Sequence, residues 1–162
     1  MHVKQKERII KWNKDRNNIS LNYDLELKML SEERREFWLA DTLPHKMQEY
    51  CDFQFVKVGT DFKMQCHLHE SVNVLLSQDA QMMALDDVQD DYMMYDHLMR
   101  LLKYEYSDKY DFDKMISDCL DIIIEANEAK PKKKDSSGKI IKGDKHTDPL
   151  KKIEEYLCRY QS

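Results

Sequence analysis

The sequence predicts an all-α protein, an antiparallel bundle of four to six helices, and two observations carry this prediction. The 162 residues include only three Gly and three Pro, too few for the many turns of an all-β fold. Charged residues make up 35% of the chain and apolar residues 41%, with the two kinds interspersed as in amphipathic helices. The length fits one domain with a buried core, so residues 1–162 are interpreted as a single domain.

The individual helices are predicted from the spacing of apolar residues and from the positions of Gly and Pro. The first helix is expected to bury Val3, Ile9 and Ile10. Pro44 suits the first turn of the third helix, and Gly59 within that helix indicates a close helix contact or a bend. The predicted helices cover residues 3–16, 23–41, 45 to the seventies, 79–84, 87–104, 111–129 and about 149–160.

Two segments differ in composition from the rest of the chain. Residues 77–110 are rich in Met, Asp and Tyr. Residues 130–147 hold seven lysines and two of the three Gly, which predicts a basic loop.

The composition also argues against several classes of protein. A net charge of −5 is unlike the basic excess of a nucleic-acid binder, although it leaves room for a small anionic ligand. No apolar run approaches the roughly 20 residues that span a bilayer, and the first residues lack the apolar centre of a signal peptide. The four cysteines contain no CxxC motif and are interpreted as reduced thiols, so a cytoplasmic protein is expected.

Two pairs of acidic residues are candidates for a metal-binding site. Glu33 and Glu36 are three residues apart on one predicted helix, and Glu49 and Asp52 are three residues apart on the next. Such pairs share a helix face, and carboxylates from two neighbouring helices could hold Mg²⁺, which prefers oxygen ligands. The spacing alone is weak evidence, because about a fifth of the chain is acidic.

The burial pattern strengthens the case for these acids. Glu33 and Glu36 lie within the apolar stripe of their helix, whereas Glu32 and Arg35 are expected to point elsewhere. Carboxylates turned toward a core must be protonated, paired or bound to cations. A metal site and a salt-bridged structural cluster both satisfy this requirement.

The motif Glu33-x-x-Glu36, followed after twelve residues by Glu49-x-x-Asp52, resembles the signature of the all-α nucleoside triphosphate pyrophosphohydrolases. This family includes MazG-like proteins, phosphoribosyl-ATP pyrophosphohydrolase and the dimeric dUTPases. Downstream, Asn127-x-x-Lys130 is similar to the family's Asn-x-x-Lys stretch. Residues 137–143 resemble a loop common in phage and bacterial MazG-like members. The segment 77–110 is longer than expected for this family and is interpreted as an insertion.

The resemblance implies hydrolysis of a nucleoside triphosphate to a monophosphate and pyrophosphate, with Mg²⁺, or Mn²⁺ as a substitute. It implies that the four acids are metal ligands and that Glu33 or Glu36 also orients the attacking water. It further implies a homodimer or a dimer of dimers in the cytoplasm, or in the host cytoplasm for a phage protein. The candidate phosphate-binding residues are Asn127, Lys130, Lys139 and Lys142.

The base could stack on Trp12 or Trp38, although core packing is the preferred interpretation for each. His45 and Lys46 are further substrate candidates, because they open the third helix, where backbone N–H groups favour anions.

A helical chain of this composition has three other candidate functions. A di-iron bundle requires Glu-x-x-His pairs, which this chain lacks. Cys66, His67 and His69 could bind zinc but lack an obvious fourth ligand. The main alternative is a non-catalytic helical interaction protein that uses its Met-rich stretch 82–99 as a binding face. This alternative would place the four acids on different, solvent-exposed sides.

Overall fold

The computed structural model describes residues 1–70, 78–136, 138–141 and 148–160, with the side chains of 68–70 and 78–87 left undescribed. These residues form an all-α bundle, as the composition predicts. Its six helices are α1 (Val3–Asp15), α2 (Tyr23–Leu39), α3 (Leu43–Glu70), α4 (Gln78–Glu105), α5 (Phe112–Glu128) and α6 (Pro149–Cys158).

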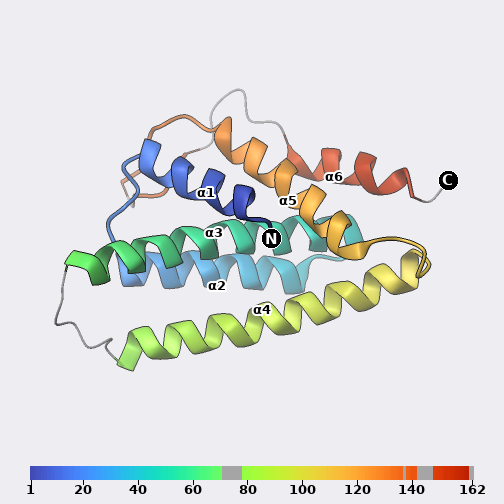
Figure 1. The fold of residues 1–162 in the computed structure, drawn as a ribbon, viewed down its shortest axis with the longest axis horizontal. Coiled ribbons are helices and arrows are strands. Elements are labelled where there is room, and N and C mark those ends of the chain that lie inside the picture. Colours follow the sequence, from blue (N-terminus) through green and yellow to red (C-terminus); the bar gives the residue numbers. More distant parts are fainter. Residues whose placement is uncertain (71–77, 137, 142–147, 161–162) are drawn as a thin grey trace.

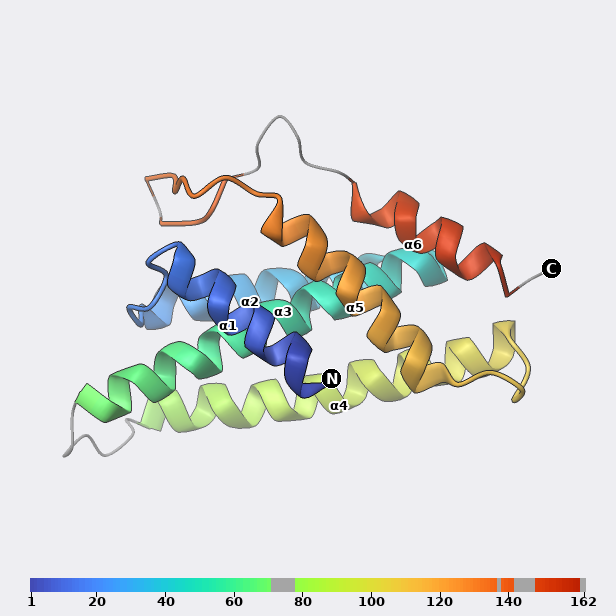
Figure 2. The same cartoon turned by 45° about the horizontal axis from the view of Figure 1, so that its top comes forward.

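Helix α3 is the centre of the bundle and contacts each of the other five helices. Helices α2 and α3 form an antiparallel hairpin whose link is residues 40–42. Figure 1 shows α4 along one side of this hairpin and α1, α5 and α6 along the other. Figure 2 gives the same arrangement after rotation, with α5 and α6 on the side away from α4.

Local sequence explains where several helices begin. The side chains of Asn22, Asp111 and Asp148 each accept a hydrogen bond from a backbone N–H in the first turn of α2, α5 and α6, respectively. Pro44 lies in the first turn of α3, as predicted, where its missing N–H costs no helical hydrogen bond.

The close contact expected at Gly59 is present. A Cβ atom there would lie 3.1 Å from Nδ2 of Asn13, so the glycine lets α1 and α3 approach closely. Asn13 itself is buried and donates from Nδ2 to the carbonyl oxygen of Ile9 at 2.9 Å. Gly59 therefore marks a helix contact that involves a polar side chain.

Two details of the prediction are wrong. Residues 79–104 form part of one helix, α4, because residues 78–105 contain neither Gly nor Pro to divide it. Val3 is 74% exposed, since it lies in the first turn of α1, ahead of that helix's contacts with the core. The Met-rich stretch 82–99 is not a single exposed face, because among its described side chains Met94 is fully buried while Met93 is 48% exposed.

The described part of the basic loop has regular structure. Lys134 and Ile140 form an antiparallel bridge, and Gly138 adopts a φ of 90° in the turn between them. We call residues 133–136 and 138–141 the basic hairpin. It lies against α2, where a Cβ at Gly138 would be 3.6 Å from Leu25 Cδ2.

None of the described helices combines the length and the apolar character that crossing a membrane would require.

Candidate metal centre

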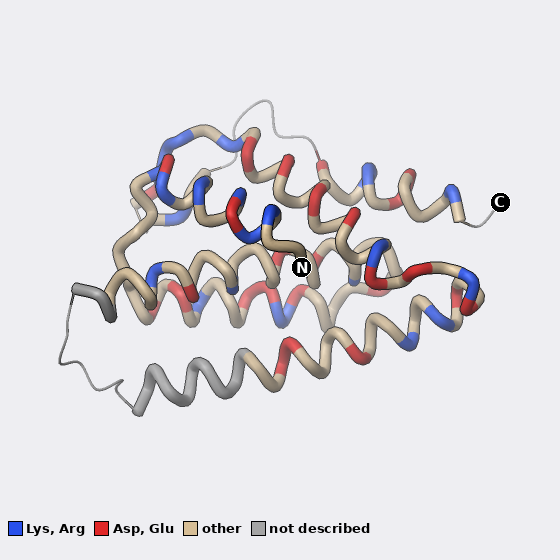
Figure 3. The backbone as a smooth tube through the Cα atoms, viewed as in Figure 1, with Lys and Arg blue, Asp and Glu red and all other residues tan. Residues whose placement is uncertain are grey.

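The two acidic pairs predicted from the sequence meet between α2 and α3. One carboxylate oxygen from each of Glu33, Glu36 and Glu49 lies within 4.8 Å of the other two. Asp52 lines the same cleft one turn further along α3. Figure 3 shows acidic positions on both of these neighbouring helices. The antiparallel hairpin therefore brings together acids from two helices that are consecutive in the chain.

The electrostatics of this cluster favour a bound cation. Burial raises the pKa of Glu33 to about 9, and the negative charges of Asp52, Glu36 and Glu49 add to this effect. Lys139 opposes the shift only in part. Glu49 is only 5% exposed. A cation would remove the penalty that keeps Glu33 protonated at neutral pH.

The donor set also fits a particular class of metal. Carboxylate oxygens are the ligands that Mg²⁺ and Mn²⁺ prefer, whereas zinc and iron–sulfur sites use thiolates or imidazoles. Among the side chains that the structure describes, this is the only converging group of three His, Cys, Asp or Glu residues. Of the zinc candidates, Cys66 and His67 are described and do not form such a group, while the side chain of His69 lies outside the described residues.

The acids open into a cleft of about 740 Å³. We call it the acidic cleft. Helices α2 and α3 supply most of its walls, and the end of α5, the start of α6 and the basic hairpin supply the rest. Its lining residues are Glu32, Glu33, Glu36, Leu39, Ala40, His45, Gln48, Glu49, Asp52, Ala126, Asn127, Lys130, Lys139, Asp148 and Pro149.

The predicted phosphate-binding residues Asn127 and Lys130 reach this cleft from the end of α5. Asn127 is 5% exposed and donates from Nδ2 to the carbonyl oxygen of Ile123 at 3.0 Å. Its Oδ1 accepts a hydrogen bond of 2.7 Å from Nζ of Lys130. The buried amide thus positions the ammonium group of Lys130 beside the acids.

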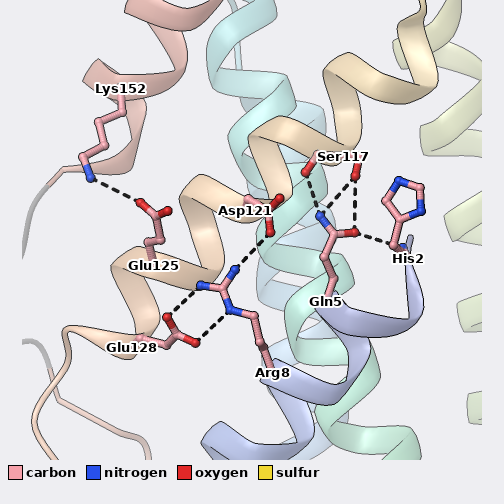
Figure 4. Close-up of polar contacts among 8 residues, drawn as sticks. All are labelled: His2, Gln5, Arg8, Ser117, Asp121, Glu125, Glu128 and Lys152. Carbon is pink, nitrogen blue, oxygen red and sulfur yellow. Dashed lines mark hydrogen bonds and ion pairs between the residues drawn. The ribbon is translucent and has the colours of Figure 1, made fainter.

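Polar contacts join α1 to α5 along much of the length of α5 (Figure 4). Arg8 binds both carboxylate oxygens of Glu128 and also contacts Asp121, at distances of 2.7 to 3.1 Å. Gln5 donates from Nε2 to the carbonyl oxygen of Ser117 at 2.8 Å. These contacts connect α1 to the helix that carries Asn127.

Lys139 enters the cleft from the basic hairpin. Its Nζ lies 3.0 Å from Oε2 of Glu32, which also lines the cleft. The expectation that Glu32 points away is therefore wrong. Helical spacing correctly placed Glu33 toward the cleft. Glu32 also reaches the cleft, because its side chain pairs with Lys139 of the basic hairpin. Lys142 lies outside the described residues.

His45 lies at the start of α3, as predicted, and its Nε2 is 3.1 Å from Oε1 of Glu49. It therefore contacts a carboxylate of the cluster. Lys46 does not line the cleft, because its Nζ donates to the carbonyl oxygen of Phe37 at 3.2 Å. Of the two candidates, only His45 belongs to the site.

The two tryptophans differ in position. Trp12 is a core residue, with its Nε1 donating to the carbonyl oxygen of Asn127 at 2.7 Å and the guanidinium of Arg16 4.5 Å from its ring centroid. It also lines a smaller pocket next to the acidic cleft. Trp38 is 44% exposed, packs against Phe37 and His97, and does not line the cleft.

Sequence reasoning missed several cleft residues. Besides Glu32, these include Gln48 on α3 and the pair Asp148 and Pro149 at the start of α6. The Asp-Pro signal identified the beginning of a helix, but nothing in the local sequence indicated what that helix end would face. Gln48 is four residues before Asp52, so helical spacing could have placed the two on the same face.

Searches among protein families, curated proteins and solved structures returned no match to this chain. The case for a function therefore rests on the motifs and on the geometry of the acidic cleft.

Proposed function

We propose that this protein is a Mg²⁺-dependent nucleoside triphosphate pyrophosphohydrolase, which releases a nucleoside monophosphate and pyrophosphate. One observation carries the proposal. A single cleft contains the four predicted metal-ligand acids together with Asn127, Lys130 and Lys139. This combination supplies a binding site for hard cations beside lysines suited to phosphate oxygens.

In the proposed reaction, water attacks the α-phosphorus and the bond to the bridging oxygen breaks, so that pyrophosphate leaves. Glu33, Glu36, Glu49 and Asp52 would hold Mg²⁺, with Mn²⁺ as a substitute. The bound metal supplies positive charge that neutralises the phosphates and stabilises the leaving oxygen. Phosphoryl chemistry of this kind depends mainly on positioning and charge stabilisation, so it needs no nucleophilic side chain.

The remaining residues have positioning roles in this scheme. Lys130 and Lys139 bind phosphate oxygens, and Asn127 orients Lys130 through their 2.7 Å hydrogen bond. Glu33 or Glu36 orients the attacking water. His45 orients the Glu49 carboxylate through their 3.1 Å contact.

The alternative of a non-catalytic interaction protein receives less support. It expects the four acids on separate exposed surfaces, whereas all four line one cleft. The exposed apolar residues of α4, Val88, Tyr92 and Met93, instead suit association of two copies of the chain. We therefore also propose a homodimer or a dimer of dimers, which light scattering on the purified protein would test.

The test of the enzymatic proposal measures pyrophosphate release from a panel of nucleoside triphosphates, with Mg²⁺ and with a chelator. We expect Glu36→Gln and Asp52→Asn to reduce the rate by about 100-fold or more, because each removes a metal ligand. Glu105→Gln is the matched control, since Glu105 is an exposed acid three residues before Asp108 and far from the cleft in sequence. Full activity in Glu36→Gln, or equal activity with chelator, would refute the proposal.

A further inference from the structure

The C-terminal end of α5 places two cleft residues, Asn127 and Lys130, on either side of the last helical residue, Glu128. The chain turns sharply at this point. The backbone N–H of Lys130 donates to the carbonyl oxygen of Asn127 at 3.1 Å, and Pro131 cannot continue the helix. Where the Lys130 side chain lies in the cleft therefore depends on how this turn is held.

Arg16, the residue that follows α1, binds the backbone of this turn. Its Nη2 lies 2.6 Å from the carbonyl oxygen of Lys130, 3.1 Å from that of Glu128 and 3.5 Å from that of Asn127. Carbonyl groups at the end of a helix lack partners within the helix, and the helix dipole favours a cation there. Arg16 does not line the acidic cleft, so it acts on the backbone of the cleft residues.

Trp12 holds the same end of α5 from one turn earlier in α1. Its Nε1 donates to the carbonyl oxygen of Asn127 at 2.7 Å, and the guanidinium of Arg16 lies 4.5 Å from its ring centroid. Residues four apart in a helix share one face. Because the Trp12 ring is buried in the core, it limits where the guanidinium of Arg16 can lie.

The donors of Arg16 are used differently from those of Arg8, which joins the same two helices. Arg8 places Nε, Nη1 and Nη2 on the carboxylates of Asp121 and Glu128. The Nε of Arg16 is buried and has no hydrogen-bond partner among the described residues. A buried N–H without a partner lowers stability. The position of Arg16 is therefore explained by the three carbonyl oxygens and not by full use of its donors.

We infer that Arg16 is a positioning residue for phosphate binding: it holds the carbonyl oxygens of Asn127 and Lys130 and thereby fixes where the Lys130 ammonium group meets the phosphates. The inference rests on the proposed function, because it assumes that a triphosphate occupies the acidic cleft. The 2.7 Å hydrogen bond from Lys130 Nζ to Asn127 Oδ1 completes the connection from α1 to the ligand. Arg16 touches no reacting group and acts through Lys130.

The test measures binding, so that it does not depend on hydrolysis. The protein with Mg²⁺ is titrated calorimetrically with inorganic triphosphate, as wild type, Arg16→Met, Lys130→Ala and the double variant. Arg16→Met should weaken binding about tenfold in the wild-type background, because methionine has no donor for the carbonyl oxygens. In the Lys130→Ala background the same substitution should change the affinity by less than about twofold, since the group that Arg16 positions is then absent.

A merely structural role would not produce this dependence on Lys130. Arg8→Met is the matched control, because it makes the same substitution between the same two helices and leaves the carbonyl oxygens held. Arg16→Lys keeps the cation and should restore part of the affinity. In pyrophosphate release, Arg16→Met should raise KM about tenfold with little change in kcat, as expected for lost phosphate binding.

A second variant keeps the test decisive if Arg16→Met does not fold, which circular dichroism would reveal. Trp12→Phe removes the N–H that binds the carbonyl oxygen of Asn127 and leaves an aromatic ring in the core. It should weaken triphosphate binding in the same direction as Arg16→Met. Its effect should also disappear in the Lys130→Ala background.

The outcomes separate the two proposals. Equal effects of Arg16→Met in both backgrounds, or an effect no larger than that of Arg8→Met, would overturn the inference, and hydrolysis by the wild type would leave the proposed function standing. Triphosphate binding that depends on Arg16 only when Lys130 is present, without hydrolysis of any nucleotide, would support the positioning role and overturn the enzymatic proposal. Absence of triphosphate binding by the wild type would overturn the inference.

Discussion

The α2–α3 hairpin buries acidic side chains in two places. Their negative charge is balanced by a lysine at one place and is in excess at the other. Near the start of α2, Glu26 is 1% exposed and is held by Nζ of Lys63 at 2.6 Å and by Oγ1 of Thr60 at 2.7 Å. Toward the other end of the same hairpin, four acids share the acidic cleft, and the pKa of Glu33 is raised to about 9. The first site contains its own cation, whereas the second carries an excess of negative charge.

This difference separates a structural role from a functional one. A buried carboxylate with a partner of its own needs nothing from solution, and it contributes to a fixed arrangement of the helices. A crowded group of carboxylates lowers the stability of the fold until a cation binds. Such a group is therefore better explained by a function than by a contribution to folding. The comparison can be tested at both places.

The largest expected effect is at the structural pair. Lys63→Met should lower the free energy of unfolding by about 3–5 kcal/mol, because it leaves Glu26 as a buried charge without its cation. Urea denaturation followed by circular dichroism measures this change. The double variant Lys63→Met with Glu26→Leu should recover most of the lost stability. A small loss in the single variant would contradict the structural role.

The second prediction concerns pH and the acidic cleft. In the folded state the pKa of Glu33 is raised from 4.5 to about 9, so the folded protein retains a proton that the unfolded chain has lost. The stability of the metal-free protein should therefore fall as pH rises from about 4.5 to about 9. Mg²⁺ should oppose this fall, giving about 2.7 kcal/mol at a concentration 100 times its Kd.

Thermal unfolding across this pH range, with chelator and with Mg²⁺, measures both effects. Glu33→Gln should flatten the part of the pH profile that Glu33 causes, because glutamine does not titrate. A metal-free protein that becomes more stable between these pH values would contradict our account of the cluster.

The smallest expected effect is at Lys139, a half-exposed cation. Its ion pair with Glu32 spans 3.0 Å, and the Lys139 side chain is 49% exposed. Lys139→Ala should change the free energy of unfolding by only about 0–1 kcal/mol, since solvent screens exposed pairs. In the proposed enzyme it should nevertheless raise KM. Lys132→Ala, at an exposed lysine of the same segment, is the control, and an equal KM for both variants would remove Lys139 from the site.

Much of the fold followed from the sequence because its signals are local. Pro44 and the Asp148-Pro149 pair mark helix starts by their backbone chemistry, which neighbouring helices do not alter. The division expected within residues 79–104 failed because the Asp pairs there are compatible with a continuous helix. Composition alone could not distinguish a polar stretch of helix from a break.

The candidate site was predictable in part for a similar reason. Glu33 and Glu36 lie on one helix and Glu49 and Asp52 on the next, so a short hairpin suffices to bring them together. Glu32 was missed because its partner Lys139 lies more than a hundred residues away in the chain. Contacts of this kind depend on how a loop folds over the bundle, which periodicity does not encode.

The short link between α2 and α3 has a consequence for how the chain folds. Closing so short a connection costs little conformational entropy, so the hairpin can form before α5 and α6 arrive. Its formation brings like charges together at once, and in water without divalent ions their repulsion opposes this early step. A cation that binds the nascent hairpin would therefore speed folding as well as stabilise the finished protein.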